Sequence, residues 1–139
     1  MKDINRNFLE PSDYKYLFFA WLFPGAGHFM LGFKRKAFII GGIIIFMILY
    51  GLYLHGHIYT PSDQLQLFKL GSLFELGMGP LYFILSATPL RAGVVKSFTF
   101  EYGTSFILTG AILNYFAIID VADHLLGRHK NSIWEENNH

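Results

Sequence analysis

The sequence contains no cysteine and few charged residues. The lack of cysteine excludes disulfides, thiolate metal sites, iron–sulfur clusters and a cysteine nucleophile. Only 15% of the 139 residues are charged, against about 25% in a typical soluble domain. The formal net charge of +1 creates no large field, so we expect no nucleic-acid partner. Because 53% of the residues are hydrophobic and 18% aromatic, the composition favours a protein embedded in a lipid bilayer.

Two long segments, 37–62 and 102–119, lack Asp, Glu, Lys and Arg altogether. Charge-free apolar runs of this length are typical of transmembrane helices. We therefore predict an all-α fold, an integral membrane helical bundle with three to four transmembrane or re-entrant helices in a single membrane domain over residues 1–139. The predicted helices cover residues 16–31, 37–54, 65–86 and 104–126.

The first predicted helix is interrupted at Pro24, which removes a backbone hydrogen bond and clashes with the preceding turn. Gly25 and Gly27 allow backbone conformations closed to other residues. Carbonyl groups freed at membrane depth need partners inside the protein, and His28 can donate to one of them. We predict a structural re-entrant turn with His28 directed inward, and ligand or haem binding by His28 is the alternative.

The basic residues predict the orientation in part. Lys34, Arg35 and Lys36 precede one apolar helix, and Arg91 and Lys96 precede another. The positive-inside rule places both clusters in the cytoplasm. The loop around residues 55–57 would then face outward if every later block crosses. The basic N-terminus prefers the inside, which requires the first block to re-enter, so its orientation stays open.

Residues 20–32 read AWLFPGAGHFMLG and are followed by a basic cluster and an apolar helix. This stretch is similar to small bacterial membrane proteins of the two-transmembrane-helix domain type, whose pattern is W-x-x-P-G-x-G-H-x-x-L-G. Residues 102–128 resemble the C-terminal half of an uncharacterised bacterial family that begins with the same motif. The resemblance implies a multi-pass protein of the bacterial inner membrane without an established activity. Receptor-like roles of the eukaryotic relatives are not implied, because their Asp-Arg-Phe loop is absent and Met30 replaces a frequent aromatic residue.

Glu75 is the acidic residue deepest within a predicted span. An unpaired carboxylate there would be costly or protonated, so it should face the bundle interior. The candidate partners are His28, Asn114 and Lys69. A structural hydrogen bond or salt bridge is one role, and a proton or ligand site is the other.

The last predicted helix carries a polar stripe. Asn114 and His124 share one face with Gly110, Ala117 and Val121. We predict that Asn114 forms an interhelical hydrogen bond. Asp120 precedes His124 by four residues, which is the spacing of an intrahelical hydrogen bond.

Metal and catalytic motifs are sparse. His55 and His57 could share a metal on an extended loop, but Asp63 is the nearest further ligand and two ligands make a poor site. We therefore predict no metal, with these two histidines as the alternative site. A Ser-His-Asp order, a phosphate-binding glycine loop and HExxH are absent, so we predict no catalytic residue.

These features favour a non-catalytic subunit or assembly factor of a larger inner-membrane complex. Its partners would be the lipid bilayer and other integral membrane subunits, or a second copy of itself, contacted through small residues such as Gly41. No cofactor is predicted. One alternative is a redox subunit that binds haem or quinone through His28 and His124. The other is an ion or proton path through Glu75, Asn114 and Asp120.

Overall fold

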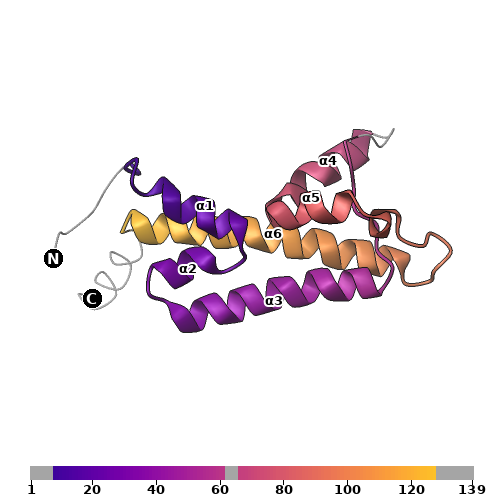
Figure 1. The fold of residues 1–139 in the computed structure, drawn as a ribbon, viewed down its shortest axis with the longest axis horizontal. Coiled ribbons are helices and arrows are strands. Elements are labelled where there is room, and N and C mark those ends of the chain that lie inside the picture. Colours follow the sequence, from indigo (N-terminus) through magenta and orange to yellow (C-terminus); the bar gives the residue numbers. More distant parts are fainter. Residues whose placement is uncertain (1–7, 62–65, 128–139) are drawn as a thin grey trace, which may run out of the picture.

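The computed structural model describes residues 8–61 and 66–127, and among these it contains helices and no strand (Figure 1). The all-α prediction is therefore confirmed for this part of the chain. The helical elements in chain order are α1 (Tyr14–Leu22), α2 (Ala26–Met30), α3 (Lys34–Tyr53), α4 (Gln66–Glu75), the 3-10 helix η1 (Leu76–Met78), α5 (Pro80–Ser86), the 3-10 helix η2 (Pro89–Ala92) and α6 (Phe100–Leu125).

The two long helices, α3 and α6, lie side by side along the molecule (Figure 1). They contain 20 and 26 residues and are long and apolar enough to cross a membrane. They run antiparallel, because Lys36 meets Asp120 at one end and Gly51 meets Gly103 at the other. A Cβ on Gly103 would lie 2.6 Å from the Gly51 carbonyl oxygen, so the backbones touch there. This antiparallel pair positions every other element.

The core lies along the inner faces of the pair. Its fully buried residues include Ile44, Ile48 and Ile107, and Met78 and Tyr82 from η1 and α5 pack against them. The outer faces instead expose large apolar side chains. Phe38 of α3 is 73% exposed and Phe116 of α6 is 62% exposed. The apolar content of the sequence thus exceeds what the core buries.

The chain breaks between α1 and α2 at Pro24, as the sequence predicts. The turn packs directly against α3, because a Cβ on Gly41 would lie 2.5 Å from the Pro24 carbonyl oxygen. A Cβ on Gly27 would lie 2.8 Å from Val121 and 3.2 Å from the Tyr16 carbonyl oxygen. The start of α1 therefore lies at the end of the helix pair where α6 finishes.

The segment 65–86 is not the single helix that we predicted. Its described part divides into α4 with 10 residues, η1 with 3 and α5 with 7, none of which has the length of a span. The break falls at Gly79, whose φ of +66° is closed to most residues, and at Pro80, which begins α5. Two helices of the described chain, α3 and α6, therefore have the length and composition of membrane spans.

The two basic clusters, which the sequence-based prediction places on one side of the membrane, lie at opposite ends of the helix pair. The Ile58 amide donates to the Arg91 carbonyl at 2.9 Å, and the Val94 amide donates to the His55 carbonyl at 3.2 Å. The segment before α6 therefore lies beside the loop after α3, at the opposite end from Lys36. The reason is that the broken segment 65–86 does not carry the chain back along the helix pair.

Candidate functional site

Four side chains with ionisable groups meet where α3 begins and α6 ends. Asp120 Oδ2 lies 2.5 Å from His28 Nε2 and 2.5 Å from Lys36 Nζ. His124 Nδ1 lies 3.7 Å from Asp120 Oδ1 and 2.7 Å from the backbone oxygen of Asp120. This Asp120 cluster thus gathers three groups that can carry positive charge around one carboxylate.

Local structure explains how these residues meet. The turn at Pro24 ends α1, and the short helix α2 follows it. His28 lies on α2 and contacts Asp120 of α6. Lys36 lies in the first turn of α3, and its long side chain reaches across to α6. His124 follows Asp120 by one helical turn. The cluster therefore depends on three helices whose order along the chain gives no hint of their proximity.

His28 is the most deeply buried member of the cluster. Its side chain is 1% exposed, whereas Lys36 and Asp120 keep part of their surface accessible. When Asp120 is ionised, it can only accept, so the N–H at His28 Nε2 donates a hydrogen bond to the carboxylate. The negative charge of the acceptor strengthens this hydrogen bond. His28 Nδ1 has no hydrogen-bond partner among the described residues. The ring is thus held at one nitrogen by Asp120.

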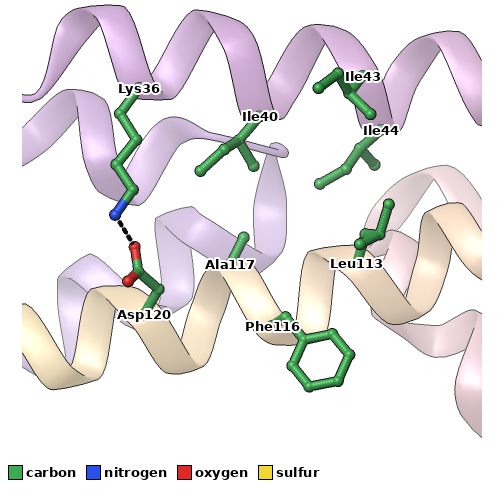
Figure 2. Close-up of a pocket in the computed structure, with 8 residues that line it drawn as sticks. All are labelled: Lys36, Ile40, Ile43, Ile44, Leu113, Phe116, Ala117 and Asp120. Atoms are coloured by element: carbon green, nitrogen blue, oxygen red, sulfur yellow. Dashed lines mark ion pairs between the residues drawn. The ribbon is translucent and has the colours of Figure 1, made fainter.

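An apolar groove of about 290 Å³ runs from the cluster along α3 and α6 (Figure 2). The pair Lys36–Asp120 closes one end of it, and Ile40 and Ala117 follow on the two helices. Its lining, named here the α3–α6 groove, consists of Lys36, Ile40, Ile43, Ile44, Leu113, Phe116, Ala117 and Asp120. The groove therefore combines apolar walls with an ion pair at one end.

The structure brings together three residues that the sequence singled out separately, namely His28, Asp120 and His124. The hydrogen bond expected between Asp120 and His124 forms through the backbone carbonyl of Asp120 rather than through its carboxylate. Sequence reasoning missed Lys36, which it treated as part of a basic loop. Only knowledge of the α3–α6 pairing would have found that residue.

The rings of His28 and His124 lie next to each other, and one nitrogen of each ring is held by Asp120. Their centroids are 6.1 Å apart with an interplanar angle of 76°. His28 Nε2 and His124 Nδ1 both point at Asp120 instead of at a shared point between the rings. Phe33 also lies against His124, with ring centroids 4.9 Å apart.

Glu75 lies inside the molecule and away from the Asp120 cluster. Its side chain is 0% exposed, and Oε2 accepts a hydrogen bond from the Tyr59 amide at 2.8 Å. The Tyr82 hydroxyl donates to the Tyr59 carbonyl at 3.0 Å. Glu75 therefore holds the loop after α3, and the described hydrogen bond goes to backbone rather than to the expected partners His28, Asn114 or Lys69.

Asn114 bridges three elements, in line with the expected interhelical hydrogen bond. It is 0% exposed, and Nδ2 donates to the Gly77 carbonyl at 2.7 Å and the Ala20 carbonyl at 3.4 Å. Trp21 Nε1 donates to the Leu76 carbonyl at 2.9 Å nearby. Carbonyl groups near helix ends lack intrahelical partners, so these side chains compensate for the breaks after α1 and before α5.

Gly41 also packs against another segment of its own chain. It is buried against the Pro24 carbonyl, and a Cβ on Gly25 would clash with the backbone of Ala37. Together with Glu75 and Asn114, it therefore contacts elements of its own chain. That these three residues also contact another chain stays a prediction.

The loop histidines lie apart from the Asp120 cluster. His57 Nδ1 is 3.3 Å from the Ala92 carbonyl, and His55 is exposed with a φ of +61°. Among the described residues, no group of three His, Asp or Glu side chains could hold a metal ion. Asp63, the expected further ligand, lies outside the described residues.

A family model covers most of the chain. Residues 15–130 match a family of unknown function, DUF6677. No curated protein and no solved structure matches the sequence. The match includes the Pro24 turn, the α3–α6 pair and all four residues of the Asp120 cluster, and the chain therefore belongs to the DUF6677 family of unknown function.

Proposed function

We propose that this chain is an integral membrane protein of the bacterial inner membrane that acts as a non-catalytic subunit or stabilising factor of a larger complex. In this proposal α3 and α6 cross the bilayer as an antiparallel pair, and the α1–α2 segment re-enters from the side of Lys36. The outer face of α3 then packs against a transmembrane helix of another subunit.

The exposed surface of α3 supports the membrane placement. Its outward side chains are large and apolar, and the most exposed are Phe38 at 73%, Phe46 at 63%, Leu49 at 59% and Tyr53 at 75%. Contiguous apolar surfaces of this kind mark contacts with lipid or with other proteins. The buried residues Glu75 and Asn114 each have a hydrogen-bond partner inside the chain, as a bilayer environment requires.

The observation that carries the proposal is the exposed Gly42. It lies among Phe38 and Ile45 in a shallow groove of about 430 Å³ between the Pro24 turn and α3. A Cβ on Gly42 would meet nothing within 4 Å, so the fold itself does not require glycine there. Lipid tails accept any apolar side chain, whereas helix–helix contacts in membranes select small residues that let backbones approach. A partner helix therefore explains Gly42 better than lipid does.

The test is the substitution Gly42→Leu in the tagged full chain, followed by recovery of membrane complexes in mild detergent. We expect Gly42→Leu to insert and fold normally but to lose its companion subunit. Gly42→Ala keeps a small residue and is the matched control that should retain the companion. Equal recovery of companions with Gly42→Leu would contradict the proposal, and so would a second copy of the chain as the sole companion.

An absorption spectrum of the recovered complex separates the proposal from the redox alternative. A haem band that disappears on substitution of His28 or His124 would replace the subunit proposal by a redox function. A complex without such a band, together with companion loss in Gly42→Leu, supports the subunit.

A further inference from the structure

The α3–α6 groove shares no lining residue with the groove around Gly42. Six of its eight lining residues are apolar, so hydrocarbon fills it better than water does. At about 30 Å³ per water-sized group, 290 Å³ holds roughly ten such groups. The groove volume is therefore large enough for a segment of an alkyl chain.

Positive charge lies at the end of this groove. A neighbouring groove, which shares Lys36 and Ile40 with it, is also lined by Lys34 and Arg35. Asp120 pairs with Lys36. Within the described chain, Lys34 contacts the ring of Phe29 at 5.9 Å, and Arg35 has no ion pair. The side chains of Lys34 and Arg35 can therefore bind an anion beside the apolar α3–α6 groove.

We propose that the α3–α6 groove holds an acyl chain of an anionic phospholipid, whose headgroup phosphate binds Lys34 and Arg35. The inference rests on the membrane placement proposed above. Basic residues at the end of a spanning helix lie at the depth of lipid headgroups, and Ile40, Ile43 and Ile44 continue toward the hydrocarbon. The Lys36–Asp120 pair fixes the boundary between the two regions (Figure 2).

The experiment uses the full chain in nanodiscs of phosphatidylcholine that contain trace photoreactive phosphatidylglycerol or, separately, photoreactive phosphatidylcholine. Both probes carry the reactive group in the acyl chain. We expect phosphatidylglycerol to label peptides around Ile40 and Leu113 in preference to phosphatidylcholine. Replacing Lys34 and Arg35 by Gln should lower that preference by about fivefold per cation removed. Lys96→Gln, at the opposite end, is the control and should leave it unchanged.

Ile43→Trp tests the tail site without disturbing the core, because Ile43 is 50% exposed and lines the groove. It should abolish labelling at Leu113 by both probes. Equal labelling of the groove by the two lipids, or a preference unaffected by Lys34→Gln and Arg35→Gln, would overturn the inference. Either result leaves the subunit proposal intact if lipid still labels the outer face of α3 around Phe46. Absence of labelling at both places would instead refute the membrane placement itself.

Discussion

Adjacent glycines on α3 should respond in opposite ways to the same substitution. A Cβ on Gly41 would lie 2.5 Å from the Pro24 carbonyl oxygen, which belongs to the backbone and cannot move aside without shifting the α1–α2 turn. Overpacking of this kind costs about 1–3 kcal/mol. A Cβ on Gly42 meets nothing within 4 Å, and alanine stabilises a helix interior by up to about 1 kcal/mol relative to glycine. The helix gain is common to both positions and cancels in the comparison, so Gly41→Ala should be less stable than Gly42→Ala by the overpacking cost of about 1–3 kcal/mol.

The assay is unfolding of each purified variant in detergent micelles by added denaturing detergent, followed by far-ultraviolet circular dichroism. Both variants add the same methyl group to neighbouring positions, so differences in expression or hydrophobicity cancel. If Gly41→Ala proves as stable as the original chain, the close packing of the Pro24 turn on α3 is refuted. Destabilisation by Gly42→Ala would show that this position is packed within the chain.

Three further predictions test the buried network and the topology. Asn114→Leu should lower the free energy of unfolding by about 1–3 kcal/mol, because the Gly77 carbonyl loses its donor; unchanged stability in the same micelle assay would contradict this role. Glu75→Gln should remain folded because the amide oxygen can still accept from the loop, whereas Glu75→Leu should increase proteolysis of that loop; equal cleavage of the two variants would argue against the anchor. Since the chain has no cysteine, Pro11→Cys and Pro61→Cys can each be probed alone with a membrane-impermeant maleimide, and they should react from opposite sides; reaction from one side would show that the α1–α2 segment crosses.

Local chemistry was sufficient to predict α3, α6 and the break at Pro24. The charge-free runs identified both long helices, although α3 begins at Lys34 and α6 at Phe100, earlier than predicted. Charged residues were read as ends of the helices, but long side chains at a helix start can reach past the apolar region. The break at Pro80 was missed, although proline after glycine is itself a signal for a helix start.

The partners of the polar residues could not be predicted, because they depend on the pairing of distant segments. His28 and Asp120 are 92 positions apart, and the sequence singled out each of them without joining them. Glu75 was expected to reach a side chain or a backbone group, and one of its partners is the Tyr59 amide, which was not among the candidates named from the sequence. A backbone group carries no sequence signature, so only the fold reveals such a contact.

The most direct test of the proposed subunit role is site-specific photocrosslinking from Phe38, which borders Gly42 in the groove on α3. A benzoylphenylalanine at this position, in cells, should form a discrete adduct with another membrane protein, and Gly42→Leu should remove that adduct. The same group at Phe98, which is 100% exposed in the loop before α6, serves as the control for accessibility. Lipid adducts alone at Phe38, or a protein adduct that persists in Gly42→Leu, would contradict the account.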